Sequence, residues 1–236
     1  MEKNFKAVLF DIDDTLFDRN AAQRIVLEQI VNGLPHVFRG CEMAGIIEAF
    51  MESDRLATEA FEAGAPSEGL REERSRQFLR LLDIQEDCAD TITDIYVRDY
   101  PKVNASMSGA VTLVKELSRR YEVGVVSNGL PDVQYQKLEA MGLRDLLSCI
   151  VLSEEIGIRK PDPRIFYRAA DLLRKQPLDC LYVGDSYTND IVGAKGAGMV
   201  TCWLNNSPSK DVDNNLNADF IVSNLEEIGK ILIKRE

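Results

Sequence analysis

The chain opens with a short apolar run, from Ala7 to Phe10, that ends abruptly in carboxylates at Asp11, Asp13 and Asp14. A short apolar run bounded by polar residues is typical of a strand that is buried on both faces. Asp11 and Asp13 are two positions apart, so their side chains project to the same side of an extended backbone. Two carboxylates held close together repel each other and need a cation or a shared proton. This pattern indicates a strand that ends in a candidate site, although an acidic turn in solvent fits this stretch alone equally well.

The next part of the chain has a helical rhythm. From about Asn20 to Tyr100, apolar residues recur at three- and four-residue spacing and no strand pattern interrupts them. The pattern predicts four amphipathic helices, at about residues 20–33, 42–63, 69–82 and 87–100. Short connections that contain Gly and Pro separate the first three. Four such helices are typical of a small helical bundle.

From about Val103 onward, predicted helices alternate with short apolar runs. The runs are expected to be strands at residues 122–127, 149–153, 181–185, 201–204 and 220–222. Strands that alternate with helices indicate an α/β protein with a Rossmann-like, doubly wound parallel sheet. The first strand belongs to this sheet, so we expect a core formed by residues 1–17 and 101–236, with the helical bundle of residues 18–100 inserted after strand one.

Charge and length narrow the classes of partner. The 236 residues carry a formal net charge of −11, which disfavours binding to nucleic-acid polymers or anionic membranes. No apolar run approaches membrane-spanning length, and the first residues show no signal-peptide pattern. We therefore expect a cytoplasmic protein, and we expect a monomer, with a dimer left open.

Histidine and cysteine usage excludes several catalytic classes. His36 is the single histidine, so one chain cannot form a multi-histidine metal site, and a histidine-based triad is not expected. The five cysteines are odd in number and no two have a Cys-x-x-Cys spacing. We expect them to be reduced thiols packed as small hydrophobic residues.

Polar and charged residues that could bind a ligand follow several predicted strands. Ser127 and Asn128 follow the second strand, Lys160 lies in the loop after the third, and Asp185 and Asp190 follow the fourth. A doubly wound sheet brings these loops to one crevice beside Asp11. Clustered carboxylates without histidine or cysteine suit a hard cation such as Mg²⁺, and a hydroxyl, backbone N–H groups and an ammonium suit phosphate oxygens. The constellation predicts a phosphoryl-transfer site.

These residues resemble the four motifs of the haloacid dehalogenase-like (HAD) hydrolases. Asp11-Ile-Asp-Asp-Thr15 is similar to the first motif, Ser127 to the second, Lys160 to the third, and Gly184-Asp185 with Asp190 to the fourth. The inserted bundle is similar to the helical cap of the first type in this family. The resemblance covers nearly the whole chain and implies a phosphatase for a small phosphorylated metabolite, of nucleoside monophosphate or sugar phosphate type.

The resemblance also implies roles for individual residues. Asp11 would be the nucleophile that forms an aspartyl-phosphate, and Asp13 would give a proton to the leaving oxygen and take one from water. Mg²⁺ would bind a carboxylate oxygen of Asp11, the backbone carbonyl of Asp13, and Asp185. Lys160 would help to keep Asp11 ionised.

The remaining motif residues have supporting roles in this interpretation. Ser127 and the backbone N–H of Asn128 would hold phosphoryl oxygens, and Thr15 would stabilise the loop after strand one. Asp190 would either contact the water molecules of the metal or orient Lys160; the sequence does not decide between them.

Other functions share parts of this pattern. A 2-haloacid dehalogenase of the same superfamily needs a nucleophilic aspartate but has little use for an acid/base group at the position of Asp13. A phosphomutase would share every core motif. A phospho-acceptor module of the receiver type, or a relative that only binds, belongs to a different class. The receiver type would be about half as long and would lack the inserted bundle, and a relative that only binds would be expected to have lost a motif residue.

Overall fold

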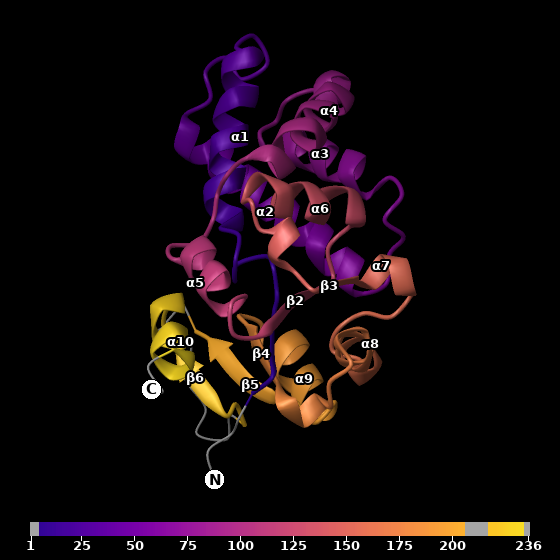
Figure 1. Cartoon of the computed structure of the whole chain (residues 1–236). Coiled ribbons are helices and arrows are strands. Elements are labelled where there is room, and N and C mark those ends of the chain that lie inside the picture. Colours follow the sequence, from indigo (N-terminus) through magenta and orange to yellow (C-terminus); the bar gives the residue numbers. More distant parts are fainter. Residues whose placement is uncertain (1–4, 206–216, 234–236) are drawn as a thin grey trace. The chain divides into compact units, whose positions relative to one another are not determined.

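The structure is a computed structural model that describes residues 5–205 and 217–233. Its contacts divide the chain into two compact units: Met1–Arg19 with Asn104–Glu236, and Asn20–Val103. Figure 1 shows the helices and strands of both units in sequence colours.

The first unit is built on a parallel sheet of six strands within the described residues. The strands are β1 (Ala7–Phe10), β2 (Glu122–Ser127), β3 (Cys149–Leu152), β4 (Cys180–Gly184), β5 (Val200–Leu204) and β6 (Phe220–Val222). Their order is β3-β2-β1-β4-β5-β6. The expectation of a doubly wound α/β sheet with a helical insertion between the first two strands is confirmed.

The strand order reverses between β1 and β4. The chain moves outward from β1 to β2 and β3, then returns to β4 on the other side of β1 and continues outward to β6. In the register of the sheet, Phe10 pairs with Val125 on one side and with Val183 on the other. The backbone N–H of Asp11 donates to the carbonyl of Val183 at 2.9 Å. The loops after β1 and β4 therefore start side by side, which is where open α/β sheets bind their ligands.

Helices connect the strands of this unit. They are α5 (Ala110–Leu117), α6 (Pro131–Ala140), α7 (Ser153–Ile156), α8 (Pro163–Leu173), α9 (Gly193–Gly196) and α10 (Leu225–Leu232), with short 3₁₀ helices η3 (Arg144–Leu146) and η4 (Pro177–Asp179). A π-helical segment, η5 (Tyr187–Val192), precedes α9. The helix expected at residues 191–197 therefore begins at Tyr187. Its first part is a π-helix, which has a wider turn than an α-helix, and this part carries Asp190.

The core of the sheet unit follows the alternation of β1. Ala7 and Leu9 share a buried cluster with the apolar face of α8, which includes Ile165 and Phe166. The side chain of Asp162 caps α8 by accepting from the N–H of Arg164 at 2.9 Å, as its position before Pro163 predicts. This capped helix, with its apolar face buried against the sheet, holds the end of the loop that carries Lys160.

Helices joined by turns and irregular segments form the second unit, and its described residues include no strand. Its helices are α1 (Arg19–Gly33), α2 (Met43–Glu62), α3 (Leu70–Leu81) and α4 (Ala89–Asp99), with 3₁₀ helices η1 (Glu86–Cys88) and η2 (Tyr100–Lys102). Phe50 packs edge-on against Phe78 with ring centroids 5.3 Å apart, and Tyr96 lies 5.2 Å from Phe50. The guanidinium of Arg74 lies 3.9 Å from the ring centre of Tyr96 and 3.1 Å from a carboxylate oxygen of Asp54. In the described part of the chain, no helix combines the length and the apolar character needed to cross a bilayer.

The three cysteines in strands, Cys149, Cys180 and Cys202, are predicted not to react with alkylating reagents in the native protein. Burial raises the pKa of Cys149 and Cys202 to about 12 and that of Cys180 to about 11, so their thiolate fraction at pH 8 is about one in a thousand or less. Cys41 and Cys88 are only partly buried. Iodoacetamide at pH 8, followed by peptide mass spectrometry, should label these two and spare the other three until the protein is denatured. Labelling of the strand cysteines as fast as Cys41 would contradict the burial described here.

Candidate active site

The centre of the site is a buried lysine. Lys160 reaches the sheet from the loop between α7 and α8, and its ammonium nitrogen lies 2.5 Å from Asp11 Oδ1 and 2.6 Å from Asp190 Oδ1. It also donates to the hydroxyl of Tyr182 at 3.2 Å. Three acceptors match the three N–H bonds of an ammonium group. Lys160 is 5% exposed and Asp190 is 1% exposed, so these ion pairs are shielded from solvent.

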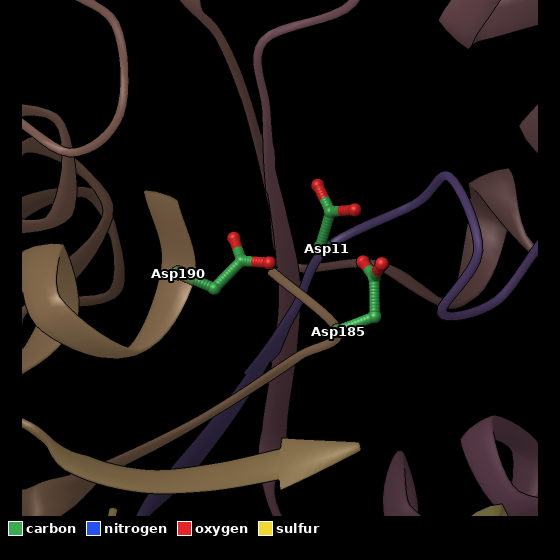
Figure 2. Close-up of side chains that lie close together, drawn as sticks. All are labelled: Asp11, Asp185 and Asp190. Carbon is green, nitrogen blue, oxygen red and sulfur yellow. The ribbon is translucent and has the colours of Figure 1, made fainter. Parts of the chain in front are cut away.

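Three carboxylates converge beside this lysine. Asp11, Asp185 and Asp190 each offer an oxygen atom, and these atoms lie within 4.8 Å of one another. Figure 2 shows the three carboxyl groups turned toward a common region from three separate segments. These segments are the loop after β1, the loop after β4, and η5. The structure thus brings together residues that the sequence placed in one crevice.

Charge in this cluster is unbalanced. Burial raises the pKa of Asp11 well above its ordinary value, although Lys160 opposes the rise. Burial, and after it the neighbouring Asp190, raises the pKa of Asp185 to about 7. Burial would lower the pKa of Lys160, but Asp11 and Asp190 outweigh it and raise that pKa. One ammonium therefore does not neutralise the carboxylates around it.

This donor set fits a divalent cation. The cluster offers only carboxylate oxygens, which are the ligands of hard cations, and it has more negative charge than Lys160 supplies. A bound cation would lower the pKa of Asp11 and Asp185 by direct attraction. The chemistry of the donor set thus supports the predicted metal site.

Asp13 lies in different surroundings from Asp11. Its Oδ1 accepts from the ammonium of Lys137 at 2.5 Å, and its Oδ2 accepts from the amide of Gln134 at 2.7 Å. Burial raises the pKa of Asp13, but Lys137 and then Arg19 outweigh it, and the net pKa is lowered. Two neighbouring carboxylates of one loop therefore have pKa values moved in opposite directions: burial dominates at Asp11, and the cations Lys137 and Arg19 dominate at Asp13.

Ser127 is the last residue of β2 and Asn128 follows it, at the same edge of the sheet. The hydroxyl oxygen of Ser127 accepts from the N–H of Gly129 at 3.1 Å and from Gln134 at 3.0 Å. The side chain of Asn128 binds the backbone of Lys160 twice, donating to its carbonyl at 3.0 Å and accepting from its N–H at 2.8 Å. Asn128 thus ties the second motif to the third, a contact that the sequence did not predict.

The two supporting residues take specific partners. The hydroxyl of Thr15 donates to Asp185 Oδ1 at 3.3 Å, which links the loops after β1 and β4. Asp190 Oδ2 accepts from the N–H of Ser186 at 3.0 Å, while its Oδ1 binds Lys160. Of the two roles left open for Asp190, the structure shows contact with Lys160, and the same residue also belongs to the carboxylate cluster.

Sequence reasoning missed three residues that contact the predicted ones. Tyr182 lies inside β4, and its hydroxyl is 3.0 Å from Asp190 Oδ1 and 3.1 Å from the carbonyl of Val126. Gln134 and Lys137 lie on α6 and are 1% and 2% exposed. The sequence did hold a signal for these two residues. They share one helix face with Leu138 and Met141, at three- and four-residue spacing, and polar residues on a face that is otherwise apolar are unusual.

Fold and site together define an α/β enzyme that works with carboxylates, a buried lysine and a hydroxyl at one edge of a parallel sheet. The chain belongs to the haloacid dehalogenase-like hydrolase family, whose model matches residues 5–198. The resemblance seen in the motifs is therefore confirmed.

Individual relatives match over most of their length. Pyrimidine 5'-nucleotidase YjjG of Escherichia coli (strain K12) is 26% identical over 232 residues, 96% of this chain and 97% of that protein. A glyceraldehyde 3-phosphate phosphatase of Methanopyrus kandleri is 31% identical over 221 residues, 88% of this chain and 87% of that protein. The crystal structure of the HAD-hydrolase YfnB from Bacillus subtilis bound to magnesium has a TM-score of 0.80 at 26% identity, and the match covers 98% of this chain and 99% of that one.

Gly184 is predicted to be essential for the approach of Asp190. A Cβ atom at Gly184 would lie 2.4 Å from Asp190 Cγ, whereas one at Gly196 would meet nothing nearer than 3.8 Å. Gly184→Ala should therefore destabilise the protein by about 1–3 kcal/mol. Gly196→Ala, in α9, is the matched control and should be neutral or stabilising by about 0.5–1 kcal/mol. Urea unfolding measures both, and equal stability of the two variants would contradict the close contact.

Asp185 is predicted to destabilise the protein when metal is removed. Its pKa of about 7 lies above that of the unfolded chain, so the ionised form at pH 8 disfavours the native state. In EDTA, Asp185→Asn should raise the melting temperature at pH 8 by a few degrees, on the order of 1–2 kcal/mol. The gain should shrink as the pH falls below 7 and vanish near pH 4, where both states carry the protonated carboxyl. Asp171→Asn, at an exposed position of α8, should show no such pH-dependent gain. A lower melting temperature for Asp185→Asn at pH 8 would contradict the charge imbalance.

Proposed function

We propose that the chain is a Mg²⁺-dependent phosphatase that hydrolyses a small phosphomonoester through an aspartyl-phosphate on Asp11. The contact between the ammonium of Lys160 and Asp11 Oδ1, inside a cluster of three carboxylates, carries the proposal. Membership of the haloacid dehalogenase-like hydrolases supports it, as do phosphatases among the full-length relatives. The chain is accordingly a phosphoric monoester hydrolase.

The first step forms a bond between a carboxylate oxygen of Asp11 and phosphorus, and breaks the ester bond to the leaving oxygen. Lys160 and the hydroxyl of Ser127 bind phosphoryl oxygens, and Asp13, which is protonated in the complex with substrate, gives its proton to the leaving alcohol. In the second step Asp13, now a carboxylate, takes a proton from water as the water attacks phosphorus. Asp11 and inorganic phosphate are released, and Asp13 is protonated again for the next substrate.

Asp11, the backbone carbonyl of Asp13, and Asp185 would hold the Mg²⁺ ion. When bound, the ion supplies positive charge that keeps Asp11 ionised and offsets the charge of the phosphoryl group. Support comes from the excess of carboxylates over cations in the cluster, and from the relative YfnB, which was crystallised with magnesium. Asp190 keeps Lys160 in place and adds to the negative charge that attracts the ion.

We assign substrate choice to the helical unit of residues 20–103, which the resemblance identifies with the family's cap. Two relatives that match this chain over most of its length act on different phosphomonoesters, a pyrimidine nucleotide and a triose phosphate. The motif residues are therefore compatible with several substrates. A nucleoside monophosphate or a sugar phosphate is the proposed class.

Asp13 favours phosphatase over dehalogenase chemistry. Both of its carboxylate oxygens have dedicated hydrogen-bond donors, which hold the group in one orientation beside Asp11. A dehalogenase passes no proton to its halide leaving group and makes no such use of this position. A phosphomutase is distinguished by its product, because it returns a phosphorylated isomer and no inorganic phosphate.

The purified protein should release nitrophenol from p-nitrophenyl phosphate with Mg²⁺ and stop when EDTA is added. Asp11→Asn removes the nucleophile and should lower kcat by at least about a thousandfold. Asp14→Asn is the matched control, the same substitution three residues away, and should keep most of the activity. Asp14 has a positive φ of 55°, which asparagine tolerates.

Two outcomes would contradict this function. Full activity of Asp11→Asn, measured by phosphate release, would remove Asp11 as the nucleophile. Halide release from 2-chloropropionate, without phosphate release from a panel of phosphorylated metabolites, would identify the chain as a dehalogenase instead.

A further inference from the structure

We propose that Gln134 and Lys137 on α6 are positioning residues that hold Asp13 and Ser127 in one hydrogen-bonded frame. This inference rests on the proposed phosphatase function and adds residues to it that the four family motifs do not include. It is carried by the contacts of α6 with the loop after β1 and with the end of β2, all within the sheet unit.

The carboxylate of Asp13 is held at both oxygens by one helix. Lys137 Nζ lies 2.5 Å from Oδ1 and Gln134 Nε2 lies 2.7 Å from Oδ2. The two donors are three residues apart, so they project from the same face of α6. Separate donors on the two oxygens fix the rotation of the carboxyl group as well as its position. Lys137 also lies 4.6 Å from the ring centre of Phe17, which holds its ammonium in the same loop.

The amide of Gln134 links Asp13 to Ser127. Its Nε2 donates to Asp13 Oδ2 and also to Ser127 Oγ at 3.0 Å. The N–H of Gly129 donates to the same hydroxyl oxygen at 3.1 Å. Two donors occupy both lone pairs of the hydroxyl oxygen, so the hydroxyl hydrogen is left to donate to a third group. A phosphoryl oxygen of the substrate is the acceptor that the proposed function places there.

The sequence leaves room for this amide at one glycine. A Cβ atom at Gly129 would lie 1.8 Å from Gln134 Nε2 and 2.5 Å from Gln134 Cδ. Only glycine at this position leaves space for the Gln134 side chain to reach the hydroxyl of Ser127. Gly129 and Gln134 therefore act together, although Gly129 directly follows Ser127-Asn128 in the sequence and Gln134 lies on the next helix.

Burial shows that these residues are not placed there for packing. Gln134 is 1% exposed and Lys137 is 2% exposed, and the carbonyl oxygen of the Gln134 amide, Oε1, has no hydrogen-bond partner in the described part of the chain. Burying an ammonium and an amide is costly compared with leucine or methionine of similar size. Reversing the amide would place Oε1 against the carboxylate of Asp13, so the unpartnered oxygen is the consequence of directing Nε2 at Asp13 and Ser127.

The test separates proton transfer from phosphate binding. With enzyme in excess over substrate, phenol release from phenyl phosphate depends on protonation of the leaving oxygen, whereas nitrophenolate leaves p-nitrophenyl phosphate with little need of a proton. Lys137→Met removes a donor that fixes the rotation of the Asp13 carboxyl group. Measured at the pH optimum of each protein, so that the change in the pKa of Asp13 does not decide the result, it should slow phenol release at least about tenfold and nitrophenol release less than about threefold. Its inhibition constant for inorganic phosphate should not change, because Lys137 contacts Asp13 and the ring of Phe17, whereas Gln134 and Gly129 donate to Ser127.

Gln134→Leu should show both effects. It should slow phenol release more than nitrophenol release, and it should also raise the inhibition constant for phosphate about three- to tenfold, because Ser127 loses a donor. Lys137→Arg keeps a charged donor and should restore the wild-type ratio of the two rates. Gln136→Leu on the same helix and Lys115→Met at an exposed position of α5 are the matched controls.

Equal slowing of both substrates by Lys137→Met, or variants that behave like their controls, would overturn the inference while leaving wild-type phosphatase activity intact. Failure of the proposed function would show differently, as a wild-type protein that releases neither product. If Lys137→Met does not fold, Gln134→Leu and Lys137→Arg still decide between the outcomes. Unequal slowing with unchanged phosphate affinity in both variants would overturn the part that concerns Ser127.

Discussion

The ammonium of Lys160, shared between Asp11 and Asp190, is the interaction on which the rest of the site depends. All three groups are at most 6% exposed, and removal of one partner from a buried ion pair costs on the order of 3–5 kcal/mol. Asp185 adds a third carboxylate, so the cluster remains negative after Lys160 is counted. The same excess of negative charge would destabilise a purely structural core, and it would favour the binding of the proposed divalent cation.

The fold supplies each member of the cluster from a different segment. The reversal of strand order between β1 and β4 sets Asp11 beside Asp185, and Thr15 bonds the two loops together. Asn128 binds the backbone of Lys160 at two points, so the end of β2 fixes the loop that carries the lysine. Gly184 has no side chain at the place where Asp190 approaches β4. Precise geometry here comes from backbone and glycine positions as much as from the charged groups.

The sequence was sufficient for the sheet, the helical insertion and the gathering of Asp11, Lys160 and Asp185, because strand ends in a doubly wound sheet share one edge. It did not reveal that Gln134 and Lys137 meet Asp13 across 121 and 124 residues, because their place on the buried face of a helix does not say which distant side chain they contact. Nor did it reveal Tyr182, since a tyrosine inside a buried strand is ordinary packing until its hydroxyl is seen 3.0 Å from Asp190. Contacts between side chains from distant segments depend on register and rotamer, which local patterns do not encode.

Trapping the phosphorylated protein tests the central claim most directly. A single turnover of phenyl phosphate with Mg²⁺, quenched in acid within milliseconds and digested at low pH, should yield a peptide containing Asp11 that carries one added phosphoryl group. Borohydride reduction should convert that aspartyl-phosphate to homoserine at position 11, as read by mass spectrometry. A phosphoryl group on any other residue, or turnover that never labels the protein, would contradict the assignment of Asp11 as the nucleophile held by Lys160.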